Sequence, residues 1–319
     1  GLKRCFLIMI PLFFSCAQEE KSPDHIQVKS RTILKNLPSA SGIEILNDRI
    51  FVISDNTLWL YELNNQFQIL DTFLIAPTED EQGHIFSKET KFDFEGIAAF
   101  QLENENHFLI FGSGSKSYER NKLVWLRFKD SIVSEVHDLS AFYAYLQKNA
   151  RLNKKNFNLE GMCVLEDQLY LFNRGNNAIW RFKLADFLDF LRNDAAFPLF
   201  EQFHIVLPKF QEVQAGFSGA SELKEEGKII FTASLEDTEN WIDDGEVLGS
   251  YLGLIDVREL RENYEPAYFP LLSEGEMLRL KVESSAVRKK TEDVYHMLLV
   301  TDSDGGNSEL LEIELNFRP

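Results

Sequence analysis

Three glutamates occupy equivalent positions in a repeated pattern, each directly before a small residue and an apolar run. They are Glu95, Glu160 and Glu283. Carboxylates that converge repel one another, so such a cluster must take up protons, pair with Lys or Arg, or bind a cation. Oxygen ligands favour Ca²⁺, Mg²⁺ or Mn²⁺ over zinc. The three residues are therefore candidate metal ligands. In the alternative interpretation, each accepts backbone N–H bonds at the start of a strand.

Basic residues stand near these glutamates in the sequence and could hold an anion. Arg174 directly follows Asn173 at a predicted strand end, and Lys116 and Arg120 follow another predicted strand. In an acidic protein, such side chains could bind a phosphate or a carboxylate. The candidate anion-binding residues are Arg174, Lys116 and Asn173. The alternative is ordinary surface charge or neutralisation of the glutamates, which we favour for Arg151, Lys154 and Lys155.

Other motifs point to turns and loops rather than to a catalytic site. The segment 302–307 resembles half of a calcium loop but lacks the later bidentate Glu in register, so a hairpin turn is the stronger interpretation. The acidic stretch 236–246 is predicted to be a solvated loop. The segment 216–219 is not a nucleophile elbow, and 112–116 lacks the spacing of a P-loop. The six His form no zinc-binding pair. No residue is assigned a catalytic role.

The glutamates belong to a repeat whose units must position them. Five segments join a small or acidic pair to an extended apolar strand, and these pairs recur every 54 to 65 residues. Two of the five carry Ser in place of Glu, at Ser41 and Ser218. Further apolar runs follow in each unit. The second runs lie at 50–53, 108–111, 169–172, 229–231 and 297–300, the third at 58–63, 123–128, 178–184, 251–257 and 309–315, and the fourth at 67–75, 131–138, 203–207 and 267–272.

This pattern predicts an all-β fold, a β-propeller of most simply five four-stranded blades, with six blades as the main alternative. The fifth unit ends without a fourth strand, whereas 25–34 precedes the first unit and is strand-like. We predict that this N-terminal strand closes the ring by pairing with the last unit, which removes free edges. Predicted helices at 139–149 and 185–193 account for the length of the units. No Pro/Gly-rich linker divides 25–319, so we expect a single domain.

The N-terminal residues GLKRCFLIMIPLFFSC are typical of a bacterial lipoprotein signal. Lys3 and Arg4 precede an apolar run that is too short to span a bilayer, and Cys16 follows a small residue as in a lipobox. We therefore predict a signal peptide at 1–15, lipidation of Cys16 and a flexible tether at 16–24. The predicted location is the outer membrane, facing the periplasm or the cell surface, with the lipid anchor as the membrane contact. The alternative is a short buried strand or helix.

The composition fits a folded, acidic domain. Lys and Arg number 33 against 51 Asp and Glu, which gives a net charge of −18, and 44% of the residues are hydrophobic. This charge argues against a nucleic-acid partner, because binding a phosphate backbone needs concentrated positive charge. Three cysteines exclude a disulfide-stapled scaffold. Removal of 1–15 and acylation of Cys16 would leave only Cys163, which we predict to be a buried, apolar side chain.

Two short motifs carry a family resemblance, DFEGI at 93–97 and NLEGM at 158–162. A D-x-E-G-I/L signature before propeller strands resembles the phytase-like and SdiA-regulated-like propellers of secreted bacterial proteins. In phytase-like propellers, channel carboxylates hold Ca²⁺ and neighbouring basic residues hold phosphate. The resemblance therefore implies Ca²⁺ or another divalent cation as the cofactor, with Glu95, Glu160 and Glu283 as ligands. It also implies Arg174 and Lys116 as anion contacts.

Two functions are compatible with these features. The first is a non-catalytic binding module on the cell envelope that recognises a small molecule or a protein at a propeller face. The anchor, the fold and the lack of a complete catalytic constellation favour it. The second is a metal-dependent hydrolase of phosphate esters or lactones, in which a cation held by the glutamates polarises an oxygen or activates water, while Arg174 binds the anion. We favour the first function.

Overall fold

The computed structural model describes residues 25–78, 85–116, 118–193, 196–238, 245–302 and 307–316. The predicted signal peptide, Cys16 and the tether all precede residue 25 and lie outside these ranges. The tip of the acidic stretch and the middle of the predicted 302–307 turn lie outside them as well. Within the described ranges, no helix is both long and apolar enough to cross a bilayer.

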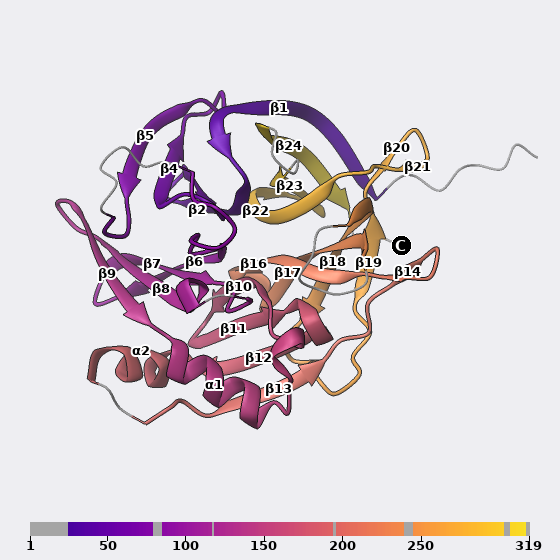
Figure 1. Ribbon diagram of the computed structural model, residues 1–319. Helices are drawn as coiled ribbons and strands as arrows, with labels where there is room; N and C mark the ends of the chain where they lie inside the picture. The colour runs from indigo at the N-terminus through magenta and orange to yellow at the C-terminus, as the bar shows by residue number, and fades with distance from the viewer. Residues whose placement is uncertain are drawn as a thin grey trace, which may run out of the picture.

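Five antiparallel sheets of four strands each form the blades of a propeller, so the predicted fold is confirmed and the six-blade alternative is wrong. The innermost strands are grouped around the middle of the molecule (Figure 1). Blade one consists of β2 (Ala40–Leu46), β3 (Arg49–Ser54), β4 (Trp59–Leu63) and β5 (Ile69–Leu74), and blade two of β6 (Phe94–Leu102), β7 (Glu105–Gly112), β8 (Lys122–Phe128) and β9 (Ile132–Asp138). Blade three consists of β10 (Leu159–Leu165), β11 (Gln168–Asn173), β12 (Ala178–Lys183) and β13 (Phe200–His204), and blade four of β16 (Gly216–Leu223), β17 (Lys228–Asp237), β18 (Glu246–Asp256) and β19 (Ala267–Pro270). Blade five consists of β22 (Lys281–Thr291), β23 (Val294–Asp302), β24 (Asn307–Asn316) and β1 (Ile26–Pro38).

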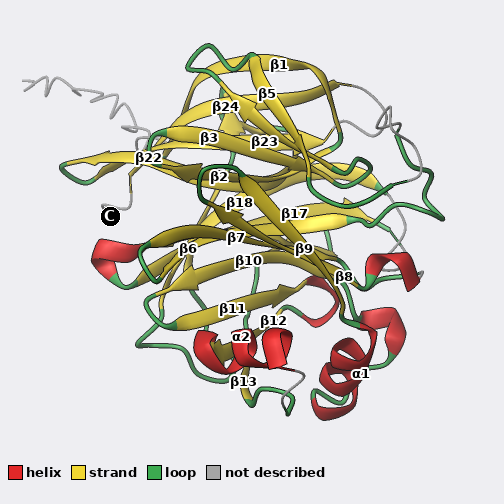
Figure 2. Cartoon of the chain, turned by 90° about the vertical axis from the view of Figure 1, so that its left-hand side faces the viewer, coloured by secondary structure: helices red, strands yellow, loops and turns green. Residues whose placement is uncertain are grey.

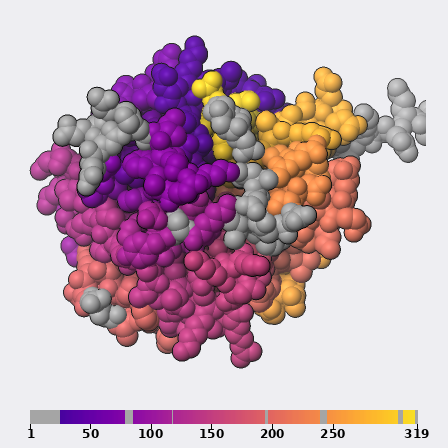
Figure 3. Space-filling model, viewed as in Figure 1, coloured from indigo at the N-terminus to yellow at the C-terminus, as the bar shows by residue number. Residues whose placement is uncertain are grey.

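The first strand of the chain closes the ring, as predicted. β1 is the outermost strand of blade five and pairs antiparallel with β24, with Ile26 opposite Leu315 and Pro38 opposite Asn307. The indigo start and the yellow end of the chain therefore lie side by side (Figure 3). β1 continues beyond the predicted end at residue 34. This pairing joins the two ends of the described chain within one sheet.

Aromatic side chains pack in the interfaces between blades, and the chain contains 27 Phe. Phe51 of blade one and Phe108 of blade two meet edge to face, with ring centroids 5.3 Å apart. Phe172 of blade three meets Phe217 of blade four in the same way at 5.1 Å. All four rings are buried, and such pairs contribute about 0.5–1.5 kcal/mol beyond the apolar area that they bury. These contacts join neighbouring blades to one another.

Two helices lie outside the sheets, beside blade three (Figure 2). α1 (Ser140–Asn149) and α2 (Leu184–Asn193) agree closely with the predicted helices. Both pack on one apolar cluster, through residues such as Phe142 of α1 and Phe187 of α2. The remaining elements are short hairpins and 3₁₀ turns: β14 (Lys209–Phe210), β15 (Val213–Gln214), β20 (Leu272–Ser273), β21 (Glu276–Met277), η1 (Tyr118–Arg120), η2 (Lys154–Asn156), η3 (Arg174–Asn176) and η4 (Lys224–Glu226).

Several strand boundaries differ from the prediction, and two of these differences bear on the packing of the blades. The acidic stretch 236–246 is not a loop throughout, because β17 continues through Glu236, which pairs with Val247 of β18. β13 lies at 200–204 rather than at the predicted 203–207. The chain leaves blade three at Ile205, which forms a parallel bridge with Tyr264 of the neighbouring blade-four segment. In both places, tertiary pairing sets the boundary and the local pattern does not.

Candidate functional site

Every innermost strand carries a β-bulge near its N-terminal end, and the bulged residue is the repeated Ser or Glu. In each blade, the pairing of the first strand with the second skips one residue. The skipped residues are Ser41, Glu95, Glu160, Ser218 and Glu283. A bulge leaves its extra residue outside the hydrogen-bond ladder and re-aims the side chain. The repeat seen in the sequence is therefore a repeat of bulges.

The bulges bring the three glutamates together around the axis. One carboxylate oxygen from each of Glu95, Glu160 and Glu283 lies within 4.8 Å of the other two. Glu160 and Glu283 are buried, whereas Glu95 is half-buried. The three side chains come from blades two, three and five, so residues more than sixty positions apart in the sequence meet at one point. We call Glu95, Glu160 and Glu283 the glutamate cluster.

Burial and mutual repulsion favour the protonated forms of these carboxyls. Burial raises the pKa of Glu160 to about 7, although Arg174 and Lys281 act in the opposite direction. Burial also raises the pKa of Glu95 well above its ordinary value, and the charge of Glu160 raises it further. The pKa of Glu283 is likewise raised by burial, against the lowering effect of Lys281. Ionising all three carboxyls at neutral pH therefore needs a compensating positive charge.

The oxygens of the glutamate cluster differ in their contacts. Glu160 Oε1 accepts a hydrogen bond from Asn158 Nδ2 at 2.7 Å. Glu283 Oε1 lies 3.0 Å from Nζ of Lys281. Within the described part of the chain, the buried Oε2 of Glu283 has no hydrogen-bond partner. Because an unpaired buried acceptor is costly, this oxygen is a candidate ligand atom for a cation.

A polar pocket, here called the axial pocket, surrounds the glutamate cluster. Its empty space, counted out to the open mouth, is about 660 Å³. Seven carboxylates and six basic side chains line it, with several serines. The carboxylates are Asp55, Asp93, Glu95, Glu160, Glu236, Glu283 and Asp302, and the basic residues are Lys88, Lys91, Lys116, Arg120, Arg174 and Lys281. This lining suits a charged, strongly polar ligand.

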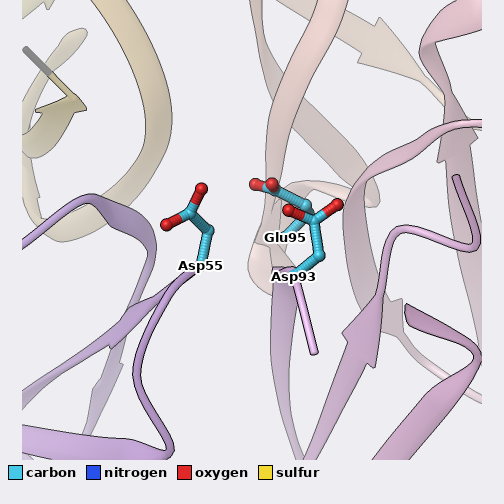
Figure 4. Close-up of side chains that lie close together, drawn as sticks. All are labelled: Asp55, Asp93 and Glu95. Atoms are coloured by element: carbon cyan, nitrogen blue, oxygen red, sulfur yellow. The ribbon is translucent and has the colours of Figure 1, made fainter. Parts of the chain in front are cut away.

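Two carboxylates beside Glu95 are neutralised by basic partners. Lys91 Nζ lies 2.5 Å from Oδ2 of Asp55 and 2.6 Å from Oδ1 of Asp93. Arg120 Nη1 lies 2.8 Å from Oδ2 of Asp93. Burial alone would raise the pKa of Asp93, but Lys91 and Arg120 hold it below its ordinary value. Figure 4 shows Asp55 facing Asp93 and Glu95. One carboxylate oxygen from each of these three residues lies within 4.8 Å of the other two.

Arg174 belongs to a second network, which joins blades three, four and five. Its Nη2 lies 2.8 Å from Oε1 of Glu236. Its Nη1 donates to Ser234 Oγ at 2.8 Å and to the carbonyl oxygen of Phe217 at 3.1 Å. Lys281 Nζ lies 3.4 Å from the same oxygen of Glu236. Arg174 thus lines the pocket, but it is 3% exposed and its guanidinium binds protein acceptors. In this geometry, the residue stabilises the blade interface.

The other two predicted anion-binding residues are placed differently from each other. Lys116 is exposed at the mouth of the pocket, with a left-handed φ of 49°. Asn173 is not among the described residues that line the pocket. Its Nδ2 donates to the carbonyl oxygen of Asn156 at 2.8 Å, and its Oδ1 accepts the N–H of Asn158 at 2.8 Å. Asn173 therefore fixes, through these two hydrogen bonds, the backbone of the segment that leads into β10. The basic residues before Glu160 are exposed: Arg151, Lys154 and Lys155.

Glu236 and Lys281 are pocket residues that the sequence reasoning misses. Glu236 belongs to the acidic stretch that is predicted to be a solvated loop. In the structure, however, its side chain is only 7% exposed. Lys281 stands two residues before Glu283, as Asp93 stands two residues before Glu95. This shared offset is the signal that could have identified Lys281, because equivalent positions in a propeller meet around the axis.

Several solved structures are similar in fold. Glutaminyl cyclase from Myxococcus xanthus is 10% identical, with a TM-score of 0.49 over 91% of this chain and 96% of its own. The PQQ-bound aldose sugar dehydrogenase from Streptomyces coelicolor is 12% identical, with a TM-score of 0.47 over 91% and 98%. A GH43 β-1,3-galactosidase with galactodeoxynojirimycin is 11% identical, with a TM-score of 0.48 over 89% and 93%. These likenesses concern the fold alone.

Sequence comparison places the chain in a family. No curated protein matches it in sequence. Residues 36–315, which include all five bulges and the glutamate cluster, match a family of unknown function, DUF6929. Because the match covers most of the chain, this protein belongs to the DUF6929 family.

Proposed function

We propose that the propeller is a binding module whose ligand site is the axial pocket, and that the glutamate cluster holds a divalent cation there. The carboxylate oxygens of Glu95, Glu160 and Glu283 are hard ligands, which favour Ca²⁺, Mg²⁺ or Mn²⁺. Ca²⁺ is the first candidate because it accepts several carboxylates in irregular geometry. The observation that carries this proposal is the convergence of three bulged glutamates within 4.8 Å.

The neighbouring charges support a cation rather than an internal ion pair as the partner of the cluster. Lys91 pairs with Asp55 and Asp93, and Arg174 pairs with Glu236. Lys281 approaches Oε1 of Glu283 but leaves Oε2 of the same carboxylate without a hydrogen-bond partner among the described residues. A bound cation would replace the protons that burial otherwise favours on the cluster.

The mouth of the pocket supports a charged small molecule, or a charged group of a protein, as the ligand. Lys116 is exposed there, and Lys88 also lines the opening. A cation on the cluster and these ammonium groups would together favour an anionic ligand such as a phosphate or a carboxylate. The resemblance of the DFEGI motif to phytase-like propellers is in keeping with this arrangement.

A metal-dependent hydrolase of phosphate esters or lactones is the second candidate, and the pKa of Glu160 favours it. In this function Glu95 and Glu283 would hold the cation and Glu160 would act as the general base, because a carboxyl with a pKa of about 7 can exchange protons near neutral pH. A panel of phosphate esters and lactones, assayed with Ca²⁺, Mg²⁺ and Mn²⁺, tests this candidate. Metal-dependent turnover that Glu160→Gln abolishes would support it, whereas no turnover with any metal would exclude it for those substrates.

Lipid anchoring at Cys16, with an outer-membrane location, also stays a proposal, and the course of β1 gives it a geometric consequence. Ile26 pairs with Leu315, whereas Pro38 pairs with Asn307. Ser39 and Ala40, which directly follow Pro38, line the axial pocket, so the pocket face lies at the Pro38 end of β1. The described chain therefore enters at the face opposite the pocket. An anchor before residue 25 would therefore be joined to the domain at the face opposite the pocket.

Isothermal titration of the metal-free protein with CaCl₂ at pH 8 tests the cation site. We expect one Ca²⁺ per chain, with binding lost in Glu160→Gln and Glu283→Gln. Glu222→Gln is the matched control, because Glu222 is also on an innermost strand and burial also raises its pKa, but it does not line the pocket. This control should bind like the unmodified protein. Absence of binding, or equal loss in the Glu222 variant, would contradict the proposal.

A further inference from the structure

The serines at the bulges of blades one and four donate hydrogen bonds to the next blade around the ring. Ser41 Oγ donates to the carbonyl oxygen of Phe94. Ser218 Oγ donates to the carbonyl oxygen of Val282 at 2.6 Å. Both serines are almost fully buried, with exposures of 2% and 1%. Two separate blade interfaces therefore use the same contact.

The accepting carbonyl is in each case the one directly before a glutamate of the cluster. Phe94 precedes Glu95, and Val282 precedes Glu283. Because the peptide unit is planar, fixing this carbonyl oxygen also fixes the N–H and the Cα of the glutamate that follows. A bulged residue has lost part of its ladder pairing, so its orientation depends on such additional contacts. The serine hydroxyl thus restrains the direction in which the neighbouring glutamate points.

A third interface repeats the contact with a different donor. Arg174 Nη1 donates to the carbonyl oxygen of Phe217, which precedes the bulged Ser218. The bulged residue of blade three is Glu160, and a carboxylate that binds the proposed cation has no proton to donate. Arg174 supplies the missing donor at this interface. At these three interfaces, the carbonyl before the bulge therefore accepts a hydrogen bond from a side chain of the preceding blade.

We propose that Ser41 and Ser218 are positioning residues of the cation site, Ser41 for Glu95 and Ser218 for Glu283. This assignment rests on the proposed function of the glutamate cluster. It explains why two of the five repeat units have Ser where the others have Glu. A glutamate at either place would add a ligand but remove the donor that aims the ligand in the following blade.

The alternative is that each serine only fastens two blades together. Ser221 provides a matched control for this alternative. Its Oγ lies 3.1 Å from Oγ of Ser285, so it also links β16 to β22 through a buried side chain. It stands on the same strand as Ser218 but away from the bulge. Loss of this hydroxyl removes a blade contact without touching the carbonyl before Glu283.

Calcium titrations of Ser41→Ala, Ser218→Ala and Ser221→Ala separate the two roles. Removing a residue that orients a metal ligand weakens affinity by about 10–100-fold. We expect a loss of about 10-fold or more in Ser41→Ala and Ser218→Ala, and less than about twofold in Ser221→Ala. Equal losses in all three variants, or none in the first two, would overturn the assignment.

A crystal structure of the metal-free Ser218→Ala variant tests the positioning without calcium. We expect the Glu283 carboxylate to turn away from Glu95 and Glu160, with the blades still packed. An unchanged Glu283 would overturn the assignment. If the unmodified protein bound no Ca²⁺ while Glu283 still moved in this variant, the proposed cation function would fail and the orienting role of Ser218 would stand.

Discussion

Arg174 Nη2 and Glu236 Oε1 lie 2.8 Å apart in an ion pair whose side chains are only 4% and 7% exposed. The pair joins η3, the turn that directly follows the second strand of blade three, to the second strand of blade four, and both residues line the axial pocket. From the sequence, Arg174 is a candidate anion contact and Glu236 part of a solvated loop. Because the two residues are buried as an ion pair between blades, both should contribute to the stability of the fold.

Replacing Arg174 with Met should destabilise the protein by up to about 3–5 kcal/mol. The buried Glu236 carboxylate would lose its partner at 2.8 Å and keep only the weaker approach of Lys281 Nζ at 3.4 Å. Chemical denaturation at pH 7 measures this loss. The double variant Arg174→Met with Glu236→Leu is the control and should recover most of the stability. Near-normal stability of the single variant, together with weakened binding of inorganic phosphate, would instead make Arg174 an anion contact.

Gly219→Ala should destabilise the protein more than Gly96→Ala, although both glycines directly follow bulged residues. A Cβ at Gly219 would lie 2.5 Å from the carbonyl oxygen of Glu283 and 2.8 Å from Cα of Ser284, so backbone would have to move. A Cβ at Gly96 would meet Met162 Cγ at 2.8 Å, and this flexible side chain can shift. We expect about 1–3 kcal/mol for Gly219→Ala, measured by thermal unfolding. A larger loss for Gly96→Ala would be the contrary result.

The metal-free protein should lose stability as the pH rises from 5 to 8. The pKa of Glu160 is about 7 in the folded protein against an ordinary value of 4.5. Between these values the folded state binds more protons than the unfolded state, so the stabilising contribution is complete below pH 4.5 and is lost as the pH passes 7. Its size is on the order of 3 kcal/mol for this buried group.

Melting temperatures measured in EDTA across this pH range test the prediction, with Glu160→Gln as the comparison. The variant should be more stable than the unmodified protein at pH 8, because Gln carries no charge to bury. It should also show a shallower pH dependence. A melting temperature that rises steadily from pH 5 to 8 in the metal-free protein would show that the carboxyls are stabilised as anions.

Cation binding should release protons at pH 6 to 7, because ligand carboxylates must be ionised. Burial raises the pKa of Glu95 and Glu283 in the same direction as that of Glu160. The binding enthalpy of Ca²⁺ should therefore depend on the ionisation enthalpy of the buffer, and affinity should increase towards pH 8. Calorimetry in two buffers at each pH measures the number of protons. Identical enthalpies in both buffers would rule out proton release.

The sequence is sufficient to predict the blades and the ring closure. The Glu–Gly, Ser–Gly and Glu–Ser pairs mark the start of each innermost strand, and the strand-like segment before the first unit predicts β1 as the closing strand. The same periodicity predicts that Glu95, Glu160 and Glu283 share one end of the axis. These features are local patterns repeated at regular spacing, which is why they can be read without coordinates.

The charge partners and the hydrogen-bond donors could not be read in the same way. Glu236 is buried only because β17 extends beyond the predicted strand and Arg174 reaches it from another blade. The role of Ser218 depends on its carbonyl acceptor Val282, which lies sixty-four residues away. Such pairings are set by how blades stack, and no local pattern in the sequence encodes them.

Anomalous diffraction from crystals soaked in MnCl₂ at pH 8 would test the cation site most directly. We expect one strong peak at coordination distance from oxygens of Glu95, Glu160 and Glu283, and its loss in Glu160→Gln. Ser41 and Ser218 should keep their hydrogen bonds to the carbonyls before Glu95 and Glu283. No peak at the glutamate cluster, or a peak held only by Asp55 and Asp93, would contradict the central claim.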